Sequence, residues 1–98
     1  VEPERVASWT GEKTPLPLFS FWDFTVGPKQ ACGGLVMSGA IQGDAAANLA
    51  EAILAGQSAH SLPPRTASRG DYWFSHAALN RWNLRLPADI ARQAQWTD

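Results

Sequence analysis

The chain has 98 residues, of which 45% are hydrophobic, a formal net charge of −1 and a single cysteine. That length suffices for one small domain. The charge leaves no basic footprint for nucleic acid, and no apolar run is long enough to cross a membrane. A lone cysteine, Cys32, excludes an internal disulfide and a multi-cysteine zinc site. We therefore expect a single α/β domain over residues 1–98 that neither binds nucleic acid nor inserts into a membrane.

The first ten residues, Val1–Thr10, fit the last turns of a helix with Val6 and Trp9 on one side. The Gly- and Pro-containing stretch Gly11–Pro15 is expected to break it. A helix that is cut off at the start of the chain leads us to expect that upstream sequence is missing.

Two short apolar runs predict strands. In Leu16–Phe21 both the odd and the even positions are apolar, except for Pro17 and Ser20. This pattern suits a strand covered on both faces. Pro17 restricts it to an edge or a strand start. The second run, Gly33–Ser38, begins with a glycine pair that lacks the spacing of a phosphate-binding fingerprint, so backbone bending or close approach is the better interpretation. Between the runs, Thr25–Ala31 reads as a loop with its turn at Gly27 and Pro28.

The clearest helix is predicted over Asp44–Ala55, with Gly56 as a left-handed cap. Its apolar stripe recurs at helical spacing and comprises Ala46, Leu49, Ala50, Ile53 and Leu54. Two of these five residues are alanine, so we expect the helix to pack closely on a sheet face. Strand, loop, strand and helix in this order predict an α/β fold with a short sheet packed by two or three helices.

After a connector at Gln57–Asp71, Ser75 is a candidate N-cap for a short helix whose buried side is Ala78, Leu79 and Trp82. Pro87 can begin a last helix at Ala88–Ala94. Trp96 is expected to pack back on that helix.

The sequence contains little that indicates a catalytic site. No serine lies in a nucleophile elbow, and the acidic residues are scattered without an evident acid–base pair. Cys32 would need a nearby base to act as a nucleophile. The two histidines, His60 and His76, have no partner at metal-ligand spacing. We therefore expect no enzymatic activity, no cofactor and no metal.

Three segments taken in order, PLFSFWDF, GGLVMSGAIQGDAAANLAEAILAGQSAHSLPP and FSHAALNRWNLRLPADI, carry a family resemblance. Together they resemble the carboxyl-terminal end of type I periplasmic binding proteins. That family includes solute-binding proteins of ABC transporters and extracytoplasmic sensor domains of bacterial histidine kinases and diguanylate cyclases. The resemblance covers most of the chain from about Pro15 onward.

The resemblance implies a bilobed fold, of which this chain would supply part of one three-layer lobe, with a small polar ligand in the cleft between lobes. In such proteins the aspartate after the strand often bonds ligand hydroxyls or amines, and Asp23 matches that position. Trp22 and Phe24 would flank it, and Met37 and Ser38 at the end of the next strand would face the same cleft. A carboxylate accepts from hydroxyls and an aromatic face covers the apolar side of a sugar. Each residue also has a simpler interpretation, namely capping for Asp23, core packing for Trp22 and turn formation for Ser38.

The chain is about one third as long as members of that family, so we expect a carboxyl-terminal fragment whose amino-terminal part would be a partner. The implied function is binding or sensing of a small solute outside the cytoplasm, as part of a transporter or a signal-transduction protein. One alternative is a protein-interaction or dimerisation module, in which Trp73, Trp82 and Trp96 form a tryptophan-rich docking surface. Another is the effector domain of a transcription repressor. A truncated sheet edge would favour a homodimer.

Overall fold

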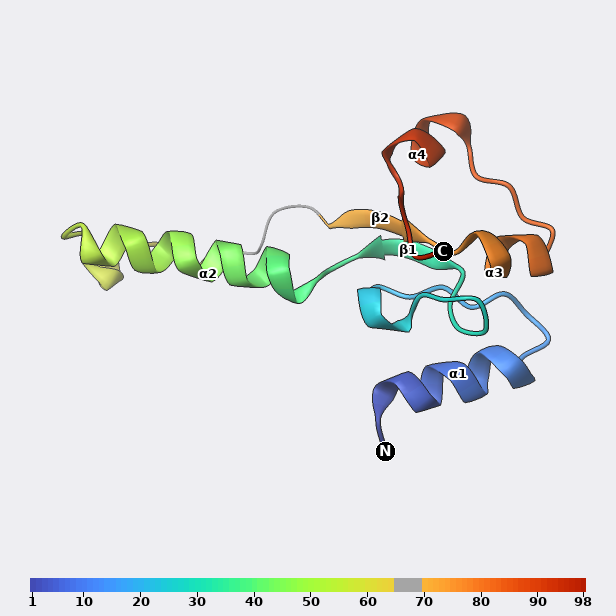
Figure 1. The fold of residues 1–98 in the computed structure, drawn as a ribbon. Coiled ribbons are helices and arrows are strands. Elements are labelled where there is room, and N and C mark those ends of the chain that lie inside the picture. Colours follow the sequence, from blue (N-terminus) through green and yellow to red (C-terminus); the bar gives the residue numbers. More distant parts are fainter. Residues whose placement is uncertain (65–69) are drawn as a thin grey trace. The chain divides into compact units, whose positions relative to one another are not determined.

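The computed structural model describes residues 1–64 and 70–98, in which four α-helices accompany one three-stranded sheet (Figure 1). This confirms the α/β class in its coarse form. Contacts between residues divide the chain into two compact units. The first unit comprises Val1–Val36 and Asp71–Asp98, and the second comprises Met37–Gly70.

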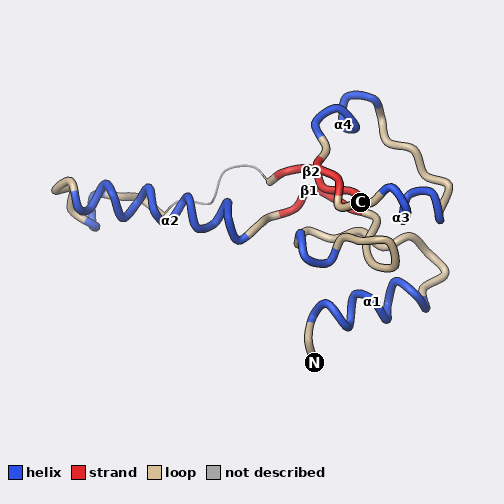
Figure 2. Tube along the Cα trace, viewed as in Figure 1, coloured by secondary structure: helices blue, strands red, loops and turns tan. Residues whose placement is uncertain are grey.

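The sheet of the first unit has the order β1-β2-β3 (Figure 2). Strand β1 (Gly33–Val36) pairs antiparallel with β2 (Asp71–Phe74), and β2 pairs parallel with the two-residue β3 (Gln95–Trp96). The glycine pair at the start of β1 permits close approach, because a Cβ at Gly33 would collide with the Trp73 carbonyl and one at Gly34 with the Ser20 carbonyl. The predicted close approach of the backbone is thus confirmed.

The core of the first unit forms where β2 meets the short helix α3 (His76–Arg81). Its buried residues are Cys32, Phe74, Ala78 and Leu79. Partly buried apolar side chains from α3, the segment after it, α4 (Ala88–Gln93) and β3 surround it, including Trp82, Ile90 and Trp96. Ser75 caps α3 by accepting from the Ala78 N–H at 3.1 Å, which confirms the predicted cap. The predicted buried side is confirmed for Ala78 and Leu79, whereas Trp82 is half-buried.

The strand predicted at Leu16–Phe21 is reduced to a single parallel bridge between Phe19 and Gly33. Two backbone hydrogen bonds hold it beside the segment before β1, from Cys32 N to Leu18 O and from Ser20 N to Gly33 O. Burial on both faces was the wrong expectation, since Leu16, Phe19 and Phe21 are exposed. Pro15 and Pro17 lack N–H donors, which shortens any ladder here.

Helix α1 (Pro3–Lys13) continues through Gly11, where the sequence predicted a break. Gly11 is buried because the helix approaches the loop at Lys29 too closely for a Cβ. Arg81 Nη1 donates to the Gly11 carbonyl at 2.7 Å, and Gln30 Nε2 donates to Ser8 Oγ at 3.0 Å. These tertiary contacts outweigh the low helix propensity of glycine.

The second unit is built on α2 (Gly39–Leu54), which is followed by a 3₁₀ turn at Ala59–Ser61 in the predicted connector. The connector's residues 65–69 lie outside the described residues. Helix α2 begins at Gly39 rather than Asp44 because Ser38 caps it, its Oγ accepting from Ile41 N at 3.2 Å. Gly56 has the predicted left-handed conformation, with φ of 105°.

No residue of α2 is buried, so the expected cover over its apolar stripe is not found. The half-buried line along the helix comprises Ile41, Ala45, Leu49 and Ala52, whereas Ile53 and Leu54 are exposed. Only Leu49 of the predicted stripe belongs to that line. Among the helices of residues 1–64 and 70–98, none is long and apolar enough to span a membrane.

Candidate ligand-binding surface

A tight turn positions the predicted residues Trp22, Asp23 and Phe24. The 3₁₀ helix η1 (Asp23–Thr25) follows the bridge at Phe19, and its last residue, Thr25, is buried. Thr25 Oγ1 lies 2.5 Å from Ser20 Oγ and 2.8 Å from the Trp22 carbonyl, and the Trp22 N–H donates to Ser20 Oγ at 3.1 Å. The two hydroxyls therefore lock the backbone on either side of Trp22 and Asp23.

Three aromatic rings project outward from this locked turn. Phe21, Trp22 and Phe24 are 63%, 41% and 44% exposed, and we call them the aromatic surface. The Phe21 and Trp22 ring centroids are 5.5 Å apart at 44°, and those of Trp22 and Phe24 are 6.0 Å apart at 23°. These distances fall within the range of favourable aromatic pairs. The rings therefore support one another as a continuous surface while their outer faces stay in water.

Asp23 lies between the two stacked rings in the chain and is half-buried. Its Oδ1 accepts from the Phe24 N–H at 2.9 Å. No hydrogen bond to its Oδ2 is found within residues 1–64 and 70–98. The side chain does not cap η1 in the usual way, because the N-cap position is Trp22. Asp23 thus keeps an oxygen that can accept from a ligand beside an aromatic face.

Met37 and Ser38, the other two predicted ligand residues, belong to the second unit. Ser38 is buried, and its hydroxyl oxygen is occupied as the cap of α2 rather than in the turn of the simpler interpretation. Met37 is half-buried directly before it. The geometry that can be described for a ligand surface therefore rests on Trp22, Asp23 and Phe24.

Sequence reasoning missed Phe21 as a member of this surface and assigned it to a covered strand. The sequence does contain a signal for exposure of this segment. After two prolines, the polar residues Ser20 and Asp23 interrupt the aromatic residues, and this pattern is unusual for a buried strand. Conversely, Trp82 and Trp96 of the tryptophan-rich docking surface are half-buried against the core. Trp73 is half-buried as well, and its indole Nε1 is buried without a hydrogen-bond partner among the described residues.

A second polar cluster forms at the start of α3, where Ser75, His76 and Asp98 meet. The residues are those of a hydrolase triad, but the bonding is different. Ser75 Oγ donates directly to Asp98 Oδ2 at 2.8 Å, and the fully buried hydroxyl is inaccessible to a substrate. His76 stacks on Trp96 with ring centroids 3.6 Å apart. This cluster fastens the end of β3 to α3, and it lacks the serine–histidine bond that activates a nucleophile.

The Asp98 carboxylate accepts hydrogen bonds from several donors of the protein. It accepts from the backbone N–H of His76 at 2.6 Å and of Ala77 at 3.3 Å. Burial alone would raise the pKa of this carboxyl, but the bonds from Ser75, His76 and Ala77, with the charge of His76, hold the pKa below its ordinary value. Asp98 is therefore a charged structural clamp.

Cys32 does not form a reactive site. It is fully buried in the core, where desolvation raises the pKa of its thiol. Across residues 1–64 and 70–98 no group of three or more histidine, cysteine or acidic residues is arranged to hold a metal ion. The aromatic surface is therefore the strongest candidate site.

Comparison of the chain with protein-family models, with curated proteins and with solved structures finds no match.

Proposed function

We propose that this chain is part of a lobe of a periplasmic-binding-protein-like domain that binds or senses a small polar solute outside the cytoplasm. The resemblance of its three ordered segments to that family supports the fold, the location and the class of activity. The observation that carries the proposal is the exposed pair of stacked rings, Trp22 and Phe24, with the Asp23 carboxylate between them in the chain. Its parent would deliver the solute to a transporter or report it to a signalling domain.

The energetics of this surface suit a weak ligand. A small solute that covers about 100 Å² of ring surface would gain roughly 2.5 kcal/mol from apolar burial. A hydrogen bond to a carboxylate adds about 1.5–3 kcal/mol. Part of this gain is lost to the entropy of association. Dissociation constants no tighter than about 1 mM, which corresponds to about −4 kcal/mol, are therefore expected for the isolated chain.

The test is an NMR titration of the 98-residue chain with neutral sugars, amino acids and amines, each to tens of millimolar. Saturable shifts of the Trp22 indole and of the Asp23 and Phe24 amides are expected. Trp22→Leu should abolish the response, whereas the matched variant Trp9→Leu, which removes an exposed tryptophan from α1, should retain it. A folded spectrum that no solute perturbs at these positions would overturn the proposal for this chain.

A second candidate function is self-association, and the exposed apolar side chains of the first unit favour it. Besides the aromatic surface they include Val6, Trp9, Leu16 and Phe19. Exposed apolar patches of this kind often mark interaction sites. Sedimentation equilibrium of the wild-type chain and of Phe19→Ser would test it, because a homodimer should weaken in the variant. A monomer at high concentration in both would exclude this function.

A further inference from the structure

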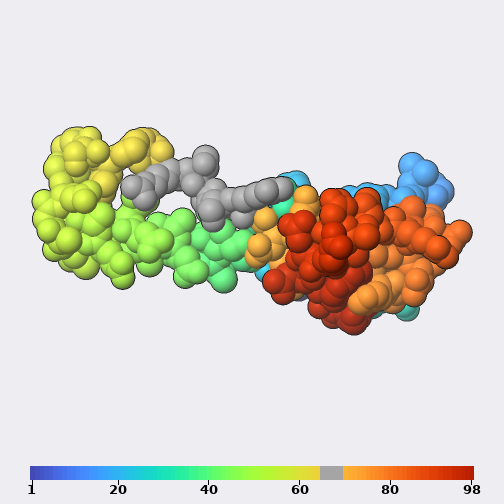
Figure 3. Space-filling view, turned by 90° about the horizontal axis from the view of Figure 1, so that it is seen from above, coloured from blue at the N-terminus to red at the C-terminus, as the bar shows by residue number. Residues whose placement is uncertain are grey.

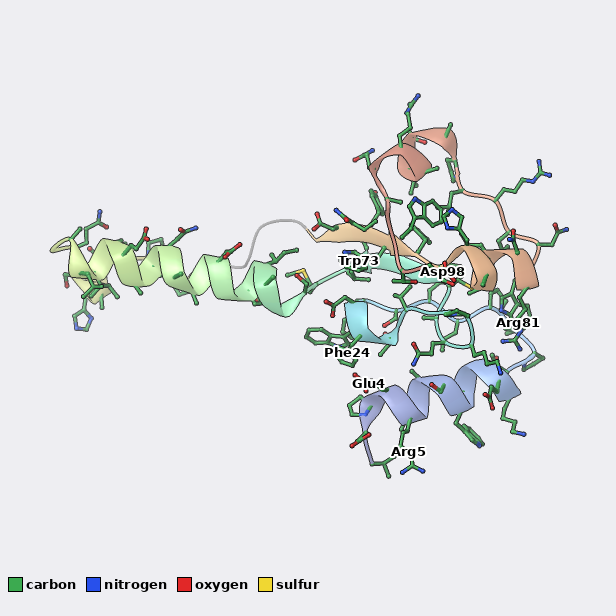
Figure 4. The ribbon with its side chains drawn as sticks, viewed as in Figure 1. Glu4, Arg5, Phe24, Trp73, Arg81 and Asp98 are labelled. Atoms are coloured by element: carbon green, nitrogen blue, oxygen red, sulfur yellow. The ribbon has the colours of Figure 1, made fainter. Side chains whose placement is uncertain are left out.

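The charge around the aromatic surface is negative, and this limits what the surface can bind. Asp23 is the only charged residue between Leu16 and Val26. Helix α1 contacts η1, and Figure 4 shows Glu4 on the side of α1 that faces Phe24 while Arg5 points away. Lys29 lies elsewhere, in a depression that it shares with Glu12, Pro28 and Arg81. An approaching ligand therefore meets carboxylates and ring faces.

Three backbone N–H donors of the turn are consumed within it. The Trp22 and Phe24 N–H groups donate to Ser20 Oγ and Asp23 Oδ1, and the Thr25 N–H donates to the Trp22 carbonyl at 3.3 Å. The Thr25 hydroxyl lies within hydrogen-bond distance of both Ser20 Oγ and that same carbonyl. A sugar hydroxyl needs donors as well as acceptors. A ligand that only offers positive charge or donors matches this surface better.

Ring faces carry negative quadrupole density, and a cation within about 6 Å of a ring centroid is attracted to it. Small cations are strongly hydrated and keep their bound water, whereas the charge of an alkylated ammonium is surrounded by apolar alkyl groups. Because such a group is only weakly hydrated, it can lie on ring faces at little cost in hydration free energy. The geometry points to an alkylated ammonium group, quaternary or tertiary, as the part of the ligand that the aromatic surface recognises, with Asp23 as its counter-charge. This inference rests on the proposed function and narrows its solute to one chemical class.

The experiment compares two ligands of the same shape, of which only one is charged. Trp22 indole shifts of the 98-residue chain are followed with choline and with its neutral carbon isostere 3,3-dimethylbutan-1-ol, at constant ionic strength. We expect choline to bind at least about fivefold more tightly, because the exposed rings attract its positive charge and Asp23 adds to that attraction. Asp23→Asn should reduce choline affinity about twofold to fivefold while it preserves the acceptor for the Phe24 N–H.

The matched control is Asp44→Asn, which removes the same charge from an exposed position of α2 in the second unit and should leave choline affinity unchanged. Equal binding of choline and its neutral isostere, or no effect of Asp23→Asn, would overturn the inference. If a neutral sugar shifts Trp22 while choline does not, the inference fails and the proposed solute binding stands. If neither perturbs Trp22, both fail.

Discussion

The two units of the molecule are stabilised in different ways. The first unit encloses a core in which Phe74, Ala78 and Leu79 are buried by side chains distant in the sequence. Its carboxyl-terminal part, orange to red in Figure 3, forms one closely packed group of atoms. In the second unit, Ser38 is the only buried residue of those described, and α2 buries none.

This difference separates local from tertiary determinants of structure. Helix α2 depends on alanine-rich propensity, the Ser38 cap and the Gly56 terminus, which are all local. A helix of 16 residues is marginal in water without tertiary packing. Helices α1 and α3 of the first unit depend on packing and long-range hydrogen bonds, such as that from Arg81 to the Gly11 carbonyl. We therefore expect the two units to respond differently to mutation.

The largest effect should come from the core. Leu79→Ala removes a buried side chain in contact with Cys32, Phe74 and Ala78, and it should lower the free energy of unfolding of the first unit by about 2–5 kcal/mol. Leu54→Ala, the same change at an exposed position of α2, should cost less than about 0.5 kcal/mol. Denaturant unfolding followed by tryptophan fluorescence measures the first unit, because all five tryptophans belong to it, and the helical circular dichroism of the same samples includes α2. Equal costs for the two variants would contradict the comparison.

Helix caps allow a sharper comparison of the two units. Ser75→Ala removes the cap of α3 and the buried donor to Asp98, so it should destabilise the first unit by about 2 kcal/mol. Ser38→Ala removes only a cap and should cost about 1 kcal/mol, seen as loss of helical circular dichroism and faster amide exchange at the start of α2. Unchanged tryptophan fluorescence is the control for Ser38→Ala. A larger loss from Ser38 than from Ser75 would reverse the expected order.

The sequence predicted features whose causes are local. The Ser75 cap and the left-handed Gly56 follow from capping and backbone sterics, and both are confirmed. Predictions that required knowledge of a distant partner fared worse. Gly11 continues a helix because Lys29 and Arg81 meet it, and no local signal announces either contact. The burial of the α2 stripe and of residues 16–21 was also predicted wrongly, because it too depends on partners distant in the sequence.

The candidate site follows the same division. Trp22, Asp23 and Phe24 are close in the chain, and one turn brings them together. Met37 and Ser38 were added by a family resemblance, and their place in a cleft stays a prediction. Phe21 was missed because apolar character predicts burial, whereas the hydroxyl bonds of Ser20 and Thr25 turn the neighbouring rings outward. Hydrogen bonding between side chains is the information that hydrophobic patterning lacks.

The smallest expected effect is a pH dependence confined to the first unit. The pKa of Asp98 is held below its ordinary value of about 3.9 in the folded state, so the folded chain binds fewer protons than the unfolded chain in mildly acidic solution. The stabilising contribution is complete above the unfolded-state pKa and is lost as the pH falls through the folded-state pKa. Asp98→Asn should therefore lower the melting temperature at pH 7 and make little difference at a pH well below the folded-state pKa. Thermal unfolding followed by tryptophan fluorescence at both pH values checks this, and a loss that persists in acid would show that the carboxylate charge is not what fastens β3 to α3.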